Sequence, residues 1–219
     1  MRLILAMIAC SIAFSVAAFG QNSGGQPGRW EREQVADALR AAPAPVSGEA
    51  RIFAWKGRDL VLVREGPGPY TCVASGSWSL RLGKAPLPYP DPFCADQNAW
   101  AYLQRVWNEP DPLHPAKPFP RAPGLVWMLA GMNVVNGRVS YSRDDSVSLR
   151  AGKSDGRAIT MTPHVMILPL PIDAGTADLP IEYDPDHPLA MWVMGGGTPT
   201  AHLHTHFSPA THEALKKLK

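Results

Sequence analysis

The sequence has little charge of either sign and few cysteines. Of its 219 residues 18% are charged, the formal net charge at pH 7 is +2, and there are three cysteines. Such a small net charge excludes the general electrostatic attraction by which proteins bind nucleic acids or anionic membranes, so we expect no nucleic-acid partner. The charged fraction is below the roughly 25% of an average globular protein, which argues against a solvated disordered chain, whereas 23 prolines and 19 glycines predict many turns.

Long apolar runs are also missing, except at the N-terminus. Arg2 is followed by an apolar run from Leu3 to Phe19, and small residues suited to cleavage stand at Ala18 and Gly20. We interpret residues 1–20 as a signal peptide, 21–30 as a flexible N-terminal segment and 31–219 as a single globular domain. The alternative is an uncleaved anchor, but the run is short of the roughly 20 apolar residues that span a bilayer. We expect a periplasmic or secreted protein with no membrane span in the mature chain.

Cleavage of this peptide would remove Cys10 and leave Cys72 and Cys94. Two cysteines in an exported chain are typical of a disulfide, which here would close a loop rich in Pro, Gly and Ser. Two free thiols are the alternative. The spacing excludes a CxxC redox site or a cysteine-based zinc site.

Strand patterns outnumber helix patterns. Helical spacing occurs at residues 31–42, which end before two prolines, and at 96–108, where Asp96 is a plausible N-cap. Strands are predicted at residues 51–55, 59–64, 70–74, 125–130, 138–149, 165–170, 191–194 and 201–207. Because helices and strands are grouped rather than alternating, we expect an α+β fold: one domain with a mostly antiparallel sheet, two main helices and long Pro-rich loops.

Several short blocks together resemble a family of uncharacterised exported bacterial proteins. They are Leu62-Val63-Arg64-Glu65-Gly66, Tyr70-Thr71-Cys72, Asp91-Pro92-Phe93-Cys94-Ala95-Asp96, Met128-Leu129-Ala130-Gly131, Pro163-His164-Val165-Met166-Ile167 and Gly197-Thr198-Pro199-Thr200-Ala201-His202-Leu203. The resemblance supports the Cys72–Cys94 pairing and one continuous domain, and implies no activity. This chain departs from the pattern by inserting Pro67 and Pro69, and by His204-Thr205-His206 where apolar residues are typical.

Histidine is the most informative residue type. His202, His204 and His206 alternate along a predicted strand, which places all three on one face, with neighbours about 6.6 Å apart. Two adjacent imidazoles can converge on one ion, but three on an extended strand cannot, so a third ligand has to come from elsewhere. His164 is the obvious source. The other interpretation is a polar face whose imidazoles bond to loop carbonyls.

Methionines accompany these histidines. Six lie in or beside the apolar segments near them: Met128, Met132, Met161, Met166, Met191 and Met194. Thioether and imidazole together in an oxidising compartment would suit copper, and ordinary core packing is the alternative. We therefore consider a copper or zinc site at His164, His202 and His204.

Other motifs are weaker. Gly152-Lys153-Ser154-Asp155-Gly156 matches the serine-hydrolase elbow but has no helix signal after it. Asp184 and Asp186 could bind calcium, but the prolines around them favour a rigid surface loop. Gly195-Gly196-Gly197 lacks the following helix that a phosphate site needs. No paired general acid and base stands out, so enzymatic activity stays open. The sequence favours a non-catalytic envelope or secreted domain that binds a ligand or partner; the alternative is a metal-binding protein or metal-dependent enzyme using His164 and His202.

Overall fold

A computed structural model describes residues 27–76, 90–130, 132–135, 138–140, 159–161, 163–170, 178–181, 184, 187 and 189–218. Within these residues the helices are α1 (Arg29–Leu39), α2 (Ala44–Ser47), α4 (Gln97–Trp107) and α6 (Pro209–Lys216). The strands are β1 (Arg51–Lys56), β2 (Asp59–Arg64), β3 (Thr71–Val73), β4 (Phe93–Ala95), β5 (Gly124–Met128), β6 (Met132–Val135), β7 (Arg138–Ser140), β8 (Ile159–Met161), β9 (His164–Leu168), β10 (Trp192–Met194) and β11 (His202–His206).

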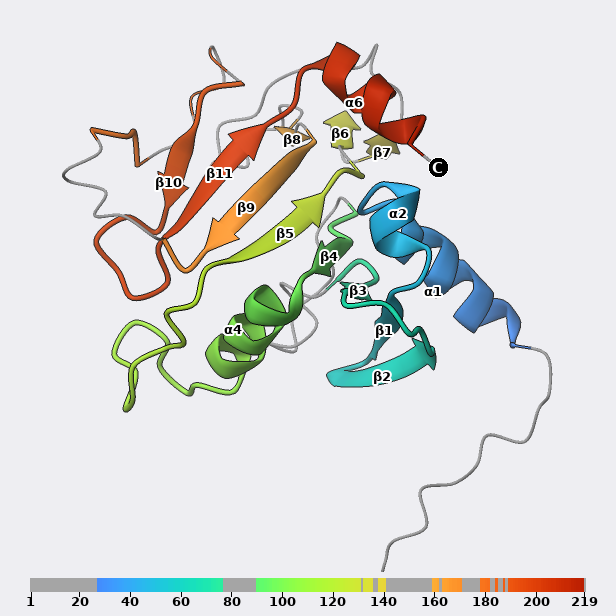
Figure 1. The fold of residues 1–219 in the computed structure, drawn as a ribbon, viewed down its shortest axis with the longest axis horizontal. Coiled ribbons are helices and arrows are strands. Elements are labelled where there is room, and N and C mark those ends of the chain that lie inside the picture. The colour runs from blue at the N-terminus through green and yellow to red at the C-terminus, as the bar shows by residue number, and fades with distance from the viewer. Residues whose placement is uncertain are drawn as a thin grey trace, which may run out of the picture.

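The main sheet has eight strands in the order β10-β11-β9-β5-β4-β3-β1-β2 (Figure 1). All its ladders are antiparallel except that between β1 and β3, which is parallel, so the sheet is mixed. A second sheet pairs strands in the order β7-β6-β8. The expected α+β arrangement with a sheet is therefore present, with four helices in the described residues where the sequence predicted two.

Two prolines lie between the N-terminal helices α1 and α2 and at the start of α2. Helix α1 begins at Arg29, inside the segment that was expected to be flexible, and ends at Leu39. The sequence predicted a helix over residues 31–42 that ends before Pro43 and Pro45, but α1 ends three residues earlier, and these prolines begin a new helix: Pro43 is the N-cap of α2, and Pro45 lies in its first turn. Proline is tolerated there because the first helical N–H groups have no intrahelical acceptor.

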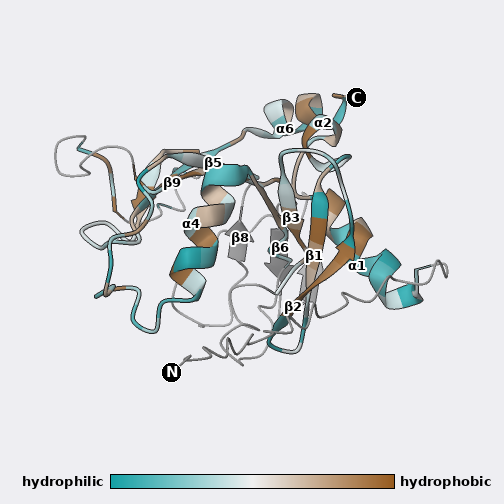
Figure 2. Cartoon of the chain, turned by 60° about the horizontal axis from the view of Figure 1, so that its bottom comes forward, coloured by the Kyte–Doolittle hydropathy of each residue, from teal (hydrophilic) through white to brown (hydrophobic). Residues whose placement is uncertain are grey.

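Helix α4 is held against the sheet at its first turn. Asp96, the expected N-cap, accepts a hydrogen bond from the backbone N–H of Ala99 and another from that of Leu125 in β5, each over 2.8 Å. One carboxylate thus caps the helix and joins it to the sheet. Hydrophobic and hydrophilic residues alternate along this helix (Figure 2). Its apolar side packs on the sheet through aromatic contacts, such as Trp100 with Phe53 and Trp107 with Trp55.

The two faces of the main sheet carry separate cores. Along β4, Phe93 and Ala95 project toward α4, and Cys94 projects the opposite way toward α1. The α4 core includes Val126, Met128, Met166 and Leu168 of the central strands. The α1 core is rich in small residues, among them Ala38, Ala41, Ala54 and Ala74, which let that helix approach closely.

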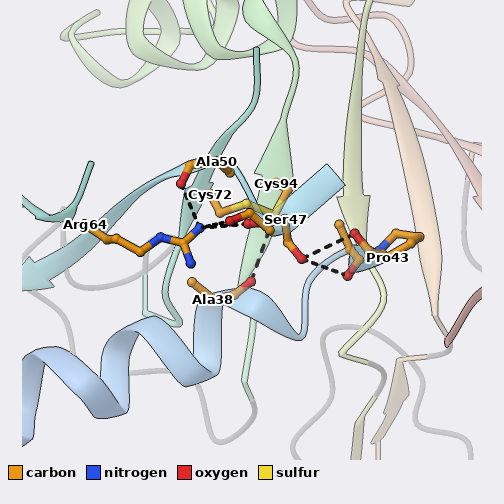
Figure 3. Close-up of a disulfide and its surroundings, with 9 residues drawn as sticks. Ala38, Pro43, Ser47, Ala50, Arg64, Cys72 and Cys94 are labelled. Atoms are coloured by element: carbon orange, nitrogen blue, oxygen red, sulfur yellow. Dashed lines mark hydrogen bonds between the residues drawn. A yellow bond between two sulfur atoms is a disulfide. The ribbon is translucent and has the colours of Figure 1, made fainter. Parts of the chain in front are cut away.

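Cys72 and Cys94 form the expected disulfide, which lies within the sheet. They are direct cross-strand partners on β3 and β4, both fully buried, with Cα atoms 3.9 Å apart (Figure 3). Beside them, the Arg64 guanidinium donates to the carbonyls of Ser47, Gly48 and Ala50, each over 2.9 Å. This side chain ties the end of α2 to β2, and burial lowers its pKa.

Among the described residues, none of the helices combines the length and apolarity needed to cross a membrane. The disulfide is compatible with a periplasmic or extracellular location. Residues 1–26, with the expected signal peptide, and residues 152–156, with the serine motif, lie outside the described residues.

Candidate functional site

The predicted histidines lie on two adjacent strands of the main sheet. Strand β11 carries His202, His204 and His206, and it pairs antiparallel with β9, where His206 is directly opposite His164. The pairing thus places the expected source of a further ligand, His164, on the strand next to the three alternating histidines. Directly opposed residues project from the same face of an antiparallel pair, so all four imidazoles share one face. We call these four residues the histidine face.

The register also places methionines opposite three of these histidines. Met166 on β9 is opposite His204, Met194 on β10 is opposite His202, and Met128 on β5 is opposite His164. Cβ atoms of such partners are roughly 4.5–5.5 Å apart. Met128 and Met166 also belong to the core beneath α4, so the histidine face continues that core along the sheet.

Three of the four imidazoles are buried, and their rings lie close together. His164 and His204 are each 2% exposed and His202 is 9% exposed. The ring centre of His204 lies 4.9 Å from that of His202 and 5.1 Å from that of His164. Two imidazoles bound to one tetrahedral ion have ring centres roughly 5 Å apart, given bonds near 2.1 Å. The spacing, though not the present ring orientation, suits a shared ion.

The ring of His202 has a defined tautomer. Its Nδ1 lies 2.9 Å from the carbonyl oxygen of Thr200. A carbonyl only accepts, so Nδ1 carries the proton and Nε2 carries the lone pair. Nε2 is buried and has no hydrogen-bond partner among the described residues. Burial lowers the pKa of His202, which keeps this lone pair available, although the bond to Thr200 acts in the opposite direction.

His204 occupies the centre of the face. Both of its ring nitrogens are buried without a hydrogen-bond partner in the described part of the chain. Burial strongly lowers its pKa, and electrostatic repulsion from the neighbouring imidazoles of His164, His202 and His206 lowers it further. The imidazole is therefore neutral at physiological pH. A buried polar group without a partner costs about 1–3 kcal/mol, which is a cost that a bound ligand would offset.

Trp192 covers one side of this ring. It is the β10 residue directly opposite His204, and the two rings stack with centres 4.5 Å apart. The indole N–H donates to Nε2 of His206 over 2.9 Å. Nothing in the sequence around Trp192 distinguishes it from the other tryptophans of the chain. Its role depends on pairing between β10 and β11, which no local pattern specifies.

The turn between β10 and β11 places the first of these histidines. Gly195 and Gly197 have φ values of 68° and 76°, a conformation that favours glycine. The Thr198 hydroxyl donates to the Gly195 carbonyl over 2.7 Å. From helix α4, the Tyr102 hydroxyl donates to the carbonyl of Pro199 over 3.2 Å, and burial raises the pKa of this phenol to about 12. The three glycines thus form the turn that joins the two strands.

The structure separates two of the predicted ligands. His202 lies four residues along β11 from His206, the partner of His164, so roughly 13 Å of strand lies between their positions. His204 stands between them and contacts both rings. Among the described residues no three His, Cys, Asp or Glu side chains converge as a metal site. An ion on this face would need small ring rotations or a thioether ligand.

The remaining sequence candidates lie elsewhere. Asp184 bonds to His187 over 2.7 Å in an exposed pair, as expected for a surface loop, and Asp186 is outside the described residues. Cys72 and Cys94 are joined to each other and so supply no thiolate.

Comparison of the chain with protein-family models, with curated proteins and with solved structures finds no match. The resemblance to exported bacterial proteins stays an expectation, and function is argued from the site itself.

Proposed function

We propose that this chain is an exported, non-catalytic domain that binds a transition-metal ion on its histidine face. The observation that carries the proposal is the ring of His202. Its Nδ1–H is held by a backbone carbonyl, which leaves a buried Nε2 lone pair aimed away from that carbonyl. Metal-binding histidines characteristically donate their other N–H to a carbonyl or carboxylate in this way.

His204 supports a cationic ligand rather than an anionic one. A neutral imidazole with a lowered pKa does not attract an anion, whereas it is the form that binds metal ions. Its two contacts, with His202 and His164, offer two alternative pairs of ligands.

The composition of the surrounding strands favours binding over catalysis. Strands β5, β9, β10 and β11 have the sequences GLVWM, HVMIL, WVM and HLHTH, without Asp, Glu, Lys or Arg. Hydrolytic chemistry needs a general acid and a general base of matched pKa. Histidine is the only side chain on these four strands that could serve as either. Export is supported by the disulfide and by the N-terminal apolar run.

Metal titration of the purified, chelator-treated protein tests this function. We expect Zn(II), Cu(I) or its redox-inert analogue Ag(I) to bind, and His202→Gln or His204→Gln to weaken binding about tenfold or more. His114→Gln and His187→Gln are matched controls, because both rings are exposed and paired with a neighbouring aspartate. Absence of binding to the wild type, or equal weakening by the control variants, would overturn the proposal. Circular dichroism establishes that each variant is folded.

A further inference from the structure

Every histidine of the predicted metal site faces a methionine on the next strand. The pairs are His204 with Met166, His164 with Met128 and His202 with Met194. They occupy four adjacent strands, β10, β11, β9 and β5, so imidazole and thioether groups are interleaved across the face. Core packing requires apolar groups at these positions, but any aliphatic side chain would satisfy it.

The donor atoms on this face distinguish between ions. Thioether sulfur is a soft ligand that selects Cu(I), whereas imidazole serves both copper and zinc. Structural zinc sites typically include thiolates, and the two cysteines in the described residues are consumed in the disulfide. Methionine sulfur is therefore the donor that separates the two metals here.

Charge also favours a monovalent ion. The four strands of the face contain no carboxylate, so none of their own side chains would neutralise the charge of a bound ion. The cost of transferring an ion from water into such surroundings is large and grows with the square of the charge, which penalises Zn(II) more than Cu(I). The stacked indole of Trp192 adds a π face, which attracts cations electrostatically.

The methionines of the histidine face differ in their exposure to solvent. Met166 and Met128 are 2% and 7% exposed, and Met194, at the β10 edge of the sheet, is 42% exposed. The His204–Met166 pair is thus the dry centre, and the His202–Met194 pair is the rim that contacts solvent. An ion could enter by way of the rim thioether and move to the central pair.

Resting on the proposed metal-binding function, we infer that the ion bound by the histidine face is Cu(I), with the sulfur of Met166 as a ligand together with His204. Cu(I) accepts low coordination numbers, so one or two imidazoles and a thioether are a sufficient ligand set. No change in the oxidation state of the ion is part of this inference.

Competition titrations under anaerobic conditions test it. Cu(I) affinity is measured against bicinchoninate, Ag(I) serves as the redox-inert probe, and Zn(II) is titrated against a chromophoric chelator. We expect Met166→Leu, which nearly conserves volume, to weaken Cu(I) and Ag(I) binding about tenfold and to leave Zn(II) binding unchanged. Met191→Leu is the matched control, since Met191 is a neighbouring methionine, 49% exposed, that precedes β10. X-ray absorption at the copper edge of the wild type should detect sulfur in the ligand shell.

The outcomes separate the two proposals. Histidine-dependent binding that is tighter for Zn(II) than for Cu(I), or a copper shell without sulfur, would overturn the inference and leave the metal-binding function standing. Loss of all metal binding in the wild type would overturn both. If Met166→Leu fails to fold, Met194→Leu at the exposed rim replaces it, and we expect this variant to take up Cu(I) more slowly. An unchanged rate of Cu(I) uptake, together with a copper ligand shell that contains no sulfur, would count against the inference.

Discussion

The indole N–H of Trp192 donates a hydrogen bond to Nε2 of His206 over 2.9 Å, across the pair formed by β10 and β11. Because Nε2 accepts this bond, His206 is the tautomer with its proton on Nδ1. We expect long-range nitrogen–proton NMR correlations to show that tautomer in the wild type. Trp192→Phe keeps an aromatic ring opposite His204 but removes the donor, so the tautomer preference should weaken and stability should fall by about 1 kcal/mol. An unchanged His206 spectrum in this variant would contradict the assignment.

Ionisation of Tyr102 should lower the free energy of unfolding at alkaline pH. Burial raises the pKa of its phenol from 10.0 to about 12 in the folded state. A raised folded-state pKa contributes stability that is complete below the unfolded-state pKa of about 10 and is lost as pH rises toward 12. Urea unfolding between pH 9 and pH 12 should show a loss approaching about 1.4 kcal/mol per pH unit from this group. Tyr102→Phe should be less stable at neutral pH, because Pro199 loses its donor, and should show a smaller loss at alkaline pH. Equal slopes in both proteins would contradict the prediction.

The disulfide should contribute measurably to stability. Cys94→Ser removes a cross-link between residues 22 positions apart, which the chain-entropy model values at roughly 3 kcal/mol. Urea unfolding with and without reductant provides the test. Reductant should bring the wild type close to the variant and should leave the variant itself unaffected. The oxidised wild type should also be lighter than the reduced form by the mass of two hydrogen atoms.

Gly124 should tolerate no side chain. A Cβ at this position would meet the backbone nitrogen of Ala99, and it would lie 2.6 Å from the Asp96 carboxylate oxygen that caps α4. Gly124→Ala should therefore displace the first turn of that helix and cost about 1–3 kcal/mol. Gly57→Ala is the comparison, because Gly57 has a φ of 64° with open space around it, so only backbone strain is added. Tryptophan fluorescence should change in the first variant, since Trp100 and Trp107 lie on α4, and stay as in the wild type in the second.

Local chemistry made some elements predictable. The Asp96 cap and the apolar stripe behind it indicated α4, and Lys56-Gly57-Arg58 indicated the β1–β2 hairpin, because capping and turn formation depend on neighbouring residues. Helix α6 is absent from the predicted helices, although Ser208 caps it by accepting from the Thr211 N–H. Helix α2 was missed because its prolines were considered only as helix terminators.

Long-range geometry was harder to predict. The parallel pairing of β1 with β3 depends on the order of strands in the sheet, which residue periodicity does not encode. The alternation of His202, His204 and His206 predicted a shared face. The same pattern could not reveal that His164 lies opposite His206, or that each predicted ligand has a methionine across from it. Those relationships follow from register, and register is set by the whole core.

Strand order gives the disulfide an architectural consequence. The strands of the main sheet fall into two groups along the chain, β1 to β3 on one side and β4, β5, β9, β10 and β11 on the other, and the two groups meet at a single ladder between β3 and β4. Cys72 and Cys94 bridge that seam and no other. A peptide-bond break anywhere between residues 73 and 93 would therefore yield two polypeptides still joined covalently at the junction of their strands. After such a break the oxidised protein would be a disulfide-linked heterodimer, and the whole histidine face would lie in its second polypeptide. On a denaturing gel it would run as one band, and reduction would separate it into two.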